Sequence, residues 1–451
     1  MQSQESSRRA PATAASAESA ESADSSASTE SMAKVAAASF IGTTIEFFDF
    51  YAYGLAAALV LNEAFFPELS PVAGTLAAFS TYAVAFVARP LGAAIFGHFG
   101  DRIGRKSILI ISLLMMGLST ALVGVLPGYH KIGVLAPILL VVLRVIQGIG
   151  LGGEWGGAAL LATEHAPAGR RARWGMFPQL GPTIGFILAN ASFLLARIAA
   201  PDSFATFGWR IPFLISFLLV LVGLWVRMTI AETPVFQQAM ERDRLSRTPF
   251  KELLQRQWKQ LLLGAGVMMI QYALFYTSTA YCLSYATKIL GVGQTPMLIV
   301  VMLAVLMLGV GTVISANLAD RIGRKRVLLI ACSISIAWGL VIFPLMDTKS
   351  YLLMWVALAG CLLLMGLSFG TMGAYLPELF ATRYRYSGAA LSYSLGGVLG
   401  GALPPLLAIR LQDWTGSWAI GVMISIIAVI SLLCVTRLPE TKDERLDQVA
   451  S

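Results

Sequence analysis

The sequence carries little charge for its length. Asp, Glu, Lys and Arg together make up 13% of the 451 residues, whereas hydrophobic residues make up 57%. A soluble domain needs more polar surface than this composition supplies. The apolar residues also form long runs that leave almost no length for a separate soluble domain. The composition therefore predicts a protein that lies within a lipid bilayer.

Reactive and metal-binding residues are also scarce. The three histidines lie in loops or at the ends of apolar runs, so none is placed to relay protons within the bilayer. The four cysteines lie inside apolar runs without the spacing of metal ligands, and we interpret them as packing residues. There is no nucleophile-base pair and no Walker-type Gly-Lys-Ser/Thr loop, which argues against an enzyme and against ATP drive. We expect no metal, no cofactor and no catalytic residue.

Large aliphatic residues are missing from the first 31 positions, apart from Met1. Such a segment cannot bury a core, so its composition predicts a disordered tail. No apolar segment follows its charged start, so it does not resemble a signal peptide.

Twelve apolar stretches are long enough to cross a membrane. A spanning helix needs about 20 mostly apolar residues, because lipid cannot satisfy backbone N–H and C=O groups. The predicted fold class is therefore an all-α integral membrane protein with twelve transmembrane helices. The stretches are 35–61, 72–96, 107–126, 133–163, 174–198, 209–230, 260–287, 296–318, 327–346, 350–376, 386–410 and 416–436.

Lysine and arginine lie mainly on one side of these predicted spans. With the N-terminus in the cytoplasm, all but eight of the 33 basic residues fall in cytoplasmic loops and tails. The positive-inside rule therefore predicts that both termini are cytoplasmic, and it explains the net charge of +8 without a nucleic-acid partner. Arg89 and Arg144 lie within spans. We expect Arg89 to extend its side chain to the membrane surface or to the neighbouring loop.

The second half of the chain repeats the first. The hexapeptide DRIGRK occurs at 101–106 and again at 320–325, in equivalent loops after the second and eighth spans. Six plus six spans joined by a basic loop is the repeat architecture of a rocking transporter. The predicted organisation is a disordered cytoplasmic tail (1–31), a six-helix bundle (32–230), a cytoplasmic linker (231–259), a second six-helix bundle (260–437) and a cytoplasmic tail (438–451).

The repeated loops have the composition of a gate. Gly104 and Gly323 permit tight turns, while Asp101 and Asp320 can cap the helix that follows each of them. The basic residues of each loop lie where they can pair with an acid at the end of the fourth or tenth span. The predicted gating residues are Asp101, Arg102, Gly104, Arg105, Lys106 and Glu164 in the first half, and Asp320, Arg321, Gly323, Arg324, Lys325 and Glu378 in the second.

The paired loops resemble the signature of the major facilitator superfamily. The segments IEFFDFYAYG (45–54), RVIQGIGLGGEWGGAALLATEHAP (144–167) and LPELFATRYRYSGAALSY (376–393) resemble its metabolite:proton symporter branch, which includes shikimate, alpha-ketoglutarate, citrate and proline/betaine carriers. The resemblance runs from about residue 34 to 440. It implies two pseudo-symmetric six-helix bundles in the cell inner membrane, with a small-molecule substrate, protons as the coupling ion and a single chain as the functional unit.

Two carboxylates interrupt the first predicted span. A charge at the bilayer centre costs about 2.5–3.5 kcal/mol on insertion scales, so Glu46 and Asp49 are expected to face a cavity or a partner. They lie at i and i+3, on one helical face with Tyr53. Arg144 in the fourth span is the expected counter-charge, and Gln147 and Glu154 extend the polar stripe of that span. Glycines around this stripe leave room for a neighbouring helix to approach.

The resemblance places a role in proton coupling on Arg144, in the pattern Arg-x-x-Gln-Gly. A carboxylate withdrawn from water holds a proton, and one that meets a guanidinium releases it, so alternating access could switch Glu46 or Asp49 between the two states. The alternative is that Glu46, Asp49, Arg144 and Glu154 form a static ion network that fixes helix packing.

Hydroxyl and aromatic residues mark the second half, whose spans hold almost no internal charge. Tyr272, Tyr276 and Thr279 follow one another at helical spacing, which suits a small polar ligand held between the halves. The alternative is that these side chains only hydrogen-bond neighbouring helices. The predicted cavity residues are Gln179, Asn190, Tyr272, Tyr276, Thr279 and Tyr393.

Three transport functions remain open at this level. The first is uptake of a small organic carboxylate, such as shikimate or a dicarboxylate, together with a proton. The second is proton-coupled uptake of proline or betaine, although about 15 residues after the last span leave no heptads for the coiled coil that such osmosensory carriers have. The third is export by proton antiport, since QLGPTIG (179–185) matches part of the antiporter signature but Phe186 replaces its final glycine.

Overall fold

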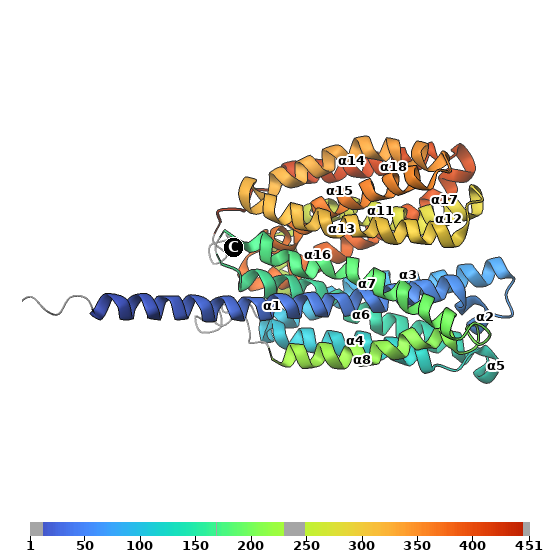
Figure 1. Cartoon of the computed structure of the whole chain (residues 1–451), viewed down its shortest axis with the longest axis horizontal. Helices are drawn as coiled ribbons and strands as arrows, with labels where there is room; N and C mark the ends of the chain where they lie inside the picture. Colours follow the sequence, from blue (N-terminus) through green and yellow to red (C-terminus); the bar gives the residue numbers. More distant parts are fainter. Residues whose placement is uncertain (1–11, 168, 230–248, 445–451) are drawn as a thin grey trace, which may run out of the picture.

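The computed structural model describes residues 12–167, 169–229 and 249–444. These residues form helices and connecting turns, with no strand among them. Figure 1 shows two groups of roughly parallel helices that lie side by side, one from the first half of the chain and one from the second. Most of the predicted linker 231–259 and the end of the predicted C-terminal tail lie outside the described residues.

The first group contains six long helices. Its short elements are α2, α5 and η1, which lie in the turns at one end. The elements are α1 (Ala12–Leu59), α2 (Leu61–Phe65), α3 (Pro71–Ile103), α4 (Arg105–Val125), α5 (Tyr129–Ile132), α6 (Leu135–Glu164), α7 (Arg171–Ala199), η1 (Gly208–Arg210) and α8 (Ile211–Met228).

The second group repeats this order after the short helix α10 (Pro249–Arg256). Two of its long helices, those that begin with α11 and with α16, are interrupted by π-helical turns. The elements are α11 (Trp258–Tyr276), η2 (Thr277–Tyr281), α12 (Cys282–Ser284), η3 (Tyr285–Ile289), α13 (Gln294–Ile322), α14 (Arg324–Asp347), α15 (Tyr351–Glu378), η4 (Thr382–Tyr384), α16 (Arg385–Gly397), η5 (Val398–Ala402), α17 (Leu403–Thr415) and α18 (Trp418–Arg437).

The two groups pack in the same internal pattern. In the first group α3 packs on α6, α4 on α8 and α1 on α7; in the second α13 packs on α15, α14 on α18 and α11 on α16. The halves meet through α3 and α6 against α16, and through α7 against α13 and α15. The sequence repeat therefore corresponds to a structural repeat, with the interface between the halves running along equivalent helices.

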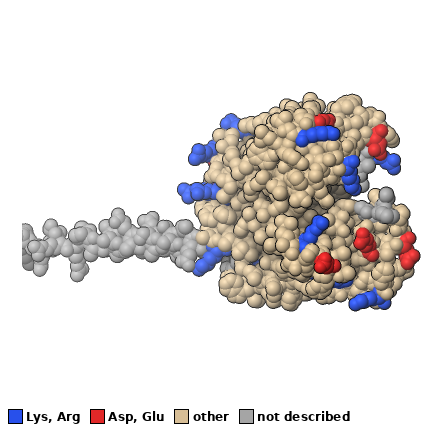
Figure 2. All heavy atoms as spheres, turned by 45° about the vertical axis from the view of Figure 1, so that its right-hand side comes forward, with Lys and Arg blue, Asp and Glu red and all other residues tan. Residues whose placement is uncertain are grey.

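Eleven of the long helices are apolar enough over their length to cross a membrane. The twelfth long helix, α1, carries Glu46 and Asp49 within its apolar part. Large apolar side chains lie exposed on the outer faces of the halves, as for Val87, Leu218 and Leu352, which a bilayer would cover. In Figure 2 most of the surface is uncharged. The charged side chains visible at the left-hand end are basic, while the acidic ones lie toward the right, among further basic ones.

Helix α1 is longer than the sequence predicts. It begins at Ala12, whereas the predicted span begins at residue 35, and Figure 1 shows its first turns projecting beyond both groups of helices. The high helix propensity of alanine allows a helix to continue beyond the part that packs. The disordered tail over 1–31 stays a prediction.

Glycines set the close approach of α3 and α6. A Cβ atom on Gly152 would overlap the carbonyl oxygen of Arg89, and one on Gly148 would overlap the backbone of Ala85. A glycine also permits close contact between the halves. A Cβ on Gly373 of α15 would overlap the carbonyl oxygen of Gly175 of α7. The prediction that the glycines of the fourth span admit a neighbouring helix is therefore confirmed.

Substitution of Gly152 by alanine is expected to destabilise the protein by about 1–3 kcal/mol, because the added methyl group must push two backbones apart. The thermal unfolding midpoint of the purified protein in detergent measures this loss. Gly309→Ala is the matched control, since its Cβ would meet Thr183 at 3.4 Å, an ordinary contact distance. Equal midpoints for the two variants would contradict the packing argument.

Candidate functional site

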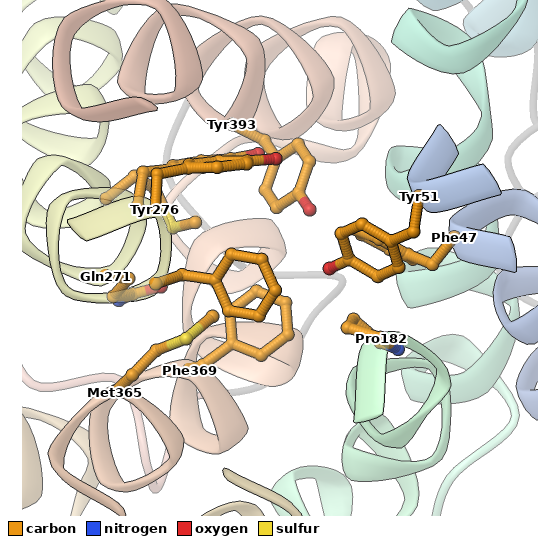
Figure 3. Close-up of a pocket in the computed structure, with 11 residues that line it drawn as sticks. Phe47, Tyr51, Pro182, Gln271, Tyr276, Met365, Phe369 and Tyr393 are labelled. Carbon is orange, nitrogen blue, oxygen red and sulfur yellow. The ribbon is translucent and has the colours of Figure 1, made fainter. Parts of the chain in front are cut away.

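A cavity lies between the two halves near the middle of the helices. Figure 3 shows the hydroxyl groups of Tyr51 and Tyr393 pointing into it from opposite halves. Most of its wall comes from α11, α15 and α16, and a smaller part from α1 and α7. The lining residues are Phe47, Tyr51, Pro182, Met268, Gln271, Tyr272, Phe275, Tyr276, Met365, Phe369 and Tyr393.

Three of the six predicted cavity residues line this space: Tyr272, Tyr276 and Tyr393. The rings of Tyr272 and Tyr276 stack in parallel with centroids 6.3 Å apart, and Tyr272 meets Tyr393 at 5.4 Å. Gln271 is a lining residue that sequence reasoning missed. Within the part of the chain that the structure describes, both polar atoms of its buried amide lack a hydrogen-bond partner, which leaves them available to a ligand.

The other three predicted cavity residues lie elsewhere. Gln179 accepts a hydrogen bond from Trp155 Nε1 and donates one to the carbonyl of Phe369, each at 2.8 Å, so it links the halves. Asn190 donates to a carbonyl of its own helix, and Thr279 does the same. Thr279 lies in the π-helical turn η2, whose wider winding removes it from the stripe that regular helical spacing predicted.

Glu46 lies beside the cavity and faces Arg89 of α3. Their closest approach is 3.9 Å, from Nη2 to Oε1, and both side chains are buried. The expectation that Arg89 reaches the membrane surface is therefore wrong, because the close α3–α6 packing and the rings of Phe50, Phe86 and Tyr393 hold its guanidinium inside. A sequence pattern could not have paired these two residues, since the pairing depends on how α1 and α3 are rotated.

Asp49 does not meet the cation that the sequence suggested. One carboxylate oxygen accepts a hydrogen bond from Ser216 of α8, and the other has no hydrogen-bond partner. Within the described part of the chain, Asp49 forms no ion pair although it is fully buried. An isolated buried carboxylate is costly in its charged form, so this site favours a protonated acid.

Arg144 also lacks an acidic partner among the described residues. Its guanidinium lies over the ring of Tyr53 at 3.7 Å from the centroid and donates to Gln147 and to the carbonyl of Thr81. Gln147 in turn donates to Thr120 at 2.8 Å. The ring of Tyr53, one turn after Asp49, occupies the face of the guanidinium, and this arrangement keeps the two charges apart.

Glu154 belongs to a separate and closed network. It pairs with Arg227 of α8 and accepts a hydrogen bond from Ser112 at 3.1 Å. Arg227 also donates to the carbonyl of Leu109. Arg227 lies within the predicted span 209–230 near its cytoplasmic end, and sequence reasoning gave it no role; the structure buries it within the first half. Glu154 therefore fits the static alternative better than a role in coupling.

The first DRIGRK loop binds the opposite half. Asp101 accepts hydrogen bonds from the backbone N–H groups of Tyr386 and Ser387, each at 3.0 Å, and from the Ser387 hydroxyl at 2.8 Å. These groups form the N-terminus of α16. Arg105 and Arg385, one from each half, both lie 3.5 Å from Glu164.

The second loop mirrors this arrangement. Asp320 accepts from the backbone N–H groups of Ala172 and Arg173 at 3.1 and 2.9 Å, at the N-terminus of α7. Glu378 pairs with Arg324 at 3.2 Å and with Arg171 of the first half at 3.5 Å. We call the Asp101–α16 and Asp320–α7 contacts the two latches.

The expectation that these aspartates cap the helix that follows them is wrong. Gly104 and Gly323 have φ of 109° and 101°, and this turn carries the next helix away from the aspartate. The first N–H groups of α14 are bonded instead by Glu440, from the segment after α18. Each aspartate is left free to cap a helix of the other half.

The remaining basic residues of the loops have local roles. Lys106 donates to the carbonyl of Met228, and Lys325 to the carbonyls of Thr436 and Leu438, so each lysine ties its loop to the last helix of its own half. Arg102 contacts His98 at 3.3 Å, and Arg321 is exposed.

The two-bundle fold and its central cavity define a class of protein, and comparison with known proteins identifies that class. A family model described as sugar (and other) transporter matches residues 34–451, so the chain belongs to this family. Its fold is that of the major facilitator superfamily. The protein is thus a multi-pass membrane transporter of the metabolite-transporting kind, and not an enzyme.

Curated relatives cover nearly the whole chain. The inner membrane metabolite transport protein YhjE of Escherichia coli K12 is 45% identical over 419 residues, 92% of this chain and 95% of its own length. The shikimate transporter of the same organism is 38% identical, covering 85% of this chain and 89% of its own length. The proline/betaine transporter of Salmonella typhimurium is 32% identical, covering 92% and 85%.

Solved structures share the fold at low sequence identity. The proton:xylose symporter XylE bound to 6-bromo-6-deoxy-D-glucose has a TM-score of 0.78 at 17% identity, covering 93% of this chain and 98% of that chain. The inward open conformation of XylE from E. coli has a TM-score of 0.66 at 18% identity, covering 93% and 99%.

Substitution of Asp101 by alanine is expected to loosen α16 rather than α4, because the charged cap lies across the interface. Loss of such a cap is worth ~1 kcal/mol, so amide hydrogen exchange at residues 386–390 should accelerate about fivefold. Asp320→Ala should have the equivalent effect at residues 172–176 of α7. Exposed Asp202→Ala is the control. Faster exchange confined to 105–109 or 324–328 would contradict the latches and favour capping of the following helix.

Proposed function

We propose that the protein takes up a small organic carboxylate together with a proton by alternating access. The observation that carries the proposal is the state of Asp49 and Arg144, two buried groups of opposite charge in one half that do not meet. Protonation removes the charge of Asp49, so this side chain can be buried without a cation beside it. Movement of Tyr53 away from Arg144 would let the guanidinium reach Asp49 and expel its proton.

The position of the cavity supports this mechanism. It lies between the halves, where a substrate would contact residues of both and so favour one arrangement of the halves over another. The two latches hold the halves together at the end where the DRIGRK loops lie, and we propose that they close the cytoplasmic side. Their opening would expose the cavity to the cytoplasm and break the hydrogen bonds of Asp101 and Asp320.

The orientation and location of the protein are part of the proposal. The excess of lysine and arginine in the loops at the latch end, visible at the left of Figure 2, supports cytoplasmic termini by the positive-inside rule. A relative named as an inner membrane protein supports the same membrane for this chain. The pathway lies within one chain, which supports a functional monomer.

The composition of the cavity wall favours a second candidate, uptake of proline or betaine. Tyr51, Tyr272, Tyr276 and Tyr393 present aromatic rings around the space, and such rings attract ammonium groups. A relative named proline/betaine transporter supports the same class of substrate. These zwitterions also carry a carboxylate, so both candidates share one anionic group.

Uptake into proteoliposomes with an imposed inward pH gradient is the direct test. Labelled shikimate, alpha-ketoglutarate, proline and betaine form the panel, and we expect accumulation of one class that disappears when an ionophore collapses the gradient. Accumulation that does not respond to the ionophore, or export under the same gradient, would contradict the proposal.

Asp49→Asn is expected to abolish accumulation while leaving exchange of labelled for unlabelled substrate, because exchange requires no net proton transfer. Arg144→Gln should also abolish accumulation, since the proton could no longer be expelled. The exposed residues Asp202→Asn and Arg197→Gln serve as matched controls. Normal accumulation by both test variants would refute the coupling role of these residues.

A further inference from the structure

The pair formed by Glu46 and Arg89 differs from the buried ion pairs of Glu154 and Glu378. Glu154 and Glu378 each form hydrogen bonds to their arginine and to a hydroxyl group. Glu46 and Arg89 approach only to 3.9 Å and form no hydrogen bond with each other. Both oxygens of Glu46, and Nε and Nη2 of Arg89, have no hydrogen-bond partner among the described residues. Buried charges that are this poorly satisfied do little for stability.

The pair lies one side chain away from the cavity. Phe47, next to Glu46 on α1, lines the cavity directly. Tyr393 of α16 also lines the cavity (Figure 3). Its ring centroid lies 5.4 Å from the Arg89 guanidinium, so Tyr393 contacts both the cavity and Arg89. Since Tyr393 belongs to the opposite half, movement of the halves would shift this ring and open a path from the cavity to Arg89.

We propose that Arg89 is the anchor for the substrate carboxylate, and that the substrate displaces Glu46, which then takes up a proton. This inference rests on the proposed function, in which Asp49 is already protonated before substrate binds; it adds a substrate site and a second acid, Glu46, that takes up a proton only when substrate binds. The planar edge of a guanidinium binds a carboxylate through two parallel hydrogen bonds, and the unpartnered Nε and Nη2 of Arg89 provide such donors.

Charge balance explains why substrate and proton move together. In the empty carrier Glu46 is ionised and neutralises Arg89. In the loaded carrier the substrate carboxylate neutralises Arg89, and one proton from water binds to a carboxylate oxygen of Glu46. The site is neutral in both states, whereas binding of substrate without the proton would leave an unpaired negative charge in a low-dielectric interior.

Other groups around Glu46 do not replace Arg89 in this exchange. Arg227 is already bonded to Glu154, and Asp49, on the same helix, is bonded to Ser216. The charged and titratable groups that face Glu46 are Arg89 from α3, Arg227 from α8, Tyr272 from α11, Tyr393 from α16, and Tyr51 and Asp49 from α1 itself.

Equilibrium binding of shikimate to the purified full chain, from mildly acidic to mildly alkaline pH, tests the inference. For the wild type, the dissociation constant should rise up to tenfold per pH unit on the alkaline side, because binding then requires uptake of a proton. Glu46→Gln should bind with no such pH dependence and at least about tenfold more tightly at alkaline pH, since no carboxylate competes for Arg89. A pH indicator in weak buffer should register about one proton per bound shikimate for the wild type and none for Glu46→Gln.

Arg89 is tested with a charged and an uncharged probe. Arg89→Gln should weaken shikimate binding at least about tenfold while leaving binding of its methyl ester unchanged, which also shows that the variant is folded. The affinity of Arg89→Lys for shikimate should lie between those of Arg89→Gln and the wild type. Exposed Glu63→Gln and Arg197→Gln are the matched controls and should behave as the wild type.

The outcomes separate the inference from the proposed function. If Glu46→Gln keeps the pH dependence of the wild type or binds more weakly at every pH, or if Arg89→Gln binds shikimate normally, the inference is overturned while proton-driven uptake stands. If the wild type binds no member of the panel of shikimate, alpha-ketoglutarate, proline and betaine, the proposed function fails and the inference with it.

Discussion

A charged side chain within a membrane-spanning helix loses the water that stabilises it, and only another group of the protein can replace that water. Two acids of the first half show the two ways of meeting this constraint. Glu154 is fully paired with Arg227 and Ser112, and its surroundings hold α4, α6 and α8 together. Glu46 lies farther from its cation, Arg89, and forms no hydrogen bond with it. The satisfied pair suits a fixed scaffold, and the unsatisfied one suits a site that changes partners.

The same constraint operates at the ends of the helices. The first N–H groups of a helix have no partner within it, and in this protein Asp101 and Asp320 supply one across the interface between the halves. The two halves are therefore held together at this end by contacts that repeat with the symmetry of the sequence. Next to each latch a glycine turns the chain away from the aspartate.

Much of the architecture was predictable because it depends on local properties of the chain. Apolar length fixed twelve spans to within a few residues at most ends, and the repeat at 101–106 and 320–325 predicted the two related bundles. Helical spacing placed Tyr272 and Tyr276 on one face, and that face lines the cavity. It failed for Thr279, because the π-helical turn that rotates this residue away has no signature in the local pattern.

The sequence by itself determined that acids, arginines and tyrosines lie within the membrane-spanning helices, because composition and periodicity are properties of one segment at a time. Only the tertiary structure decided which acid meets which cation. Asp49 and Arg144 looked complementary, yet Tyr53 and Ser216 keep them apart, while Arg89 and Arg227 each meet an acid that sequence did not assign to them. Such pairings depend on the rotation and spacing of helices far apart in the chain, and glycine contacts such as that of Gly152 with α3 set both.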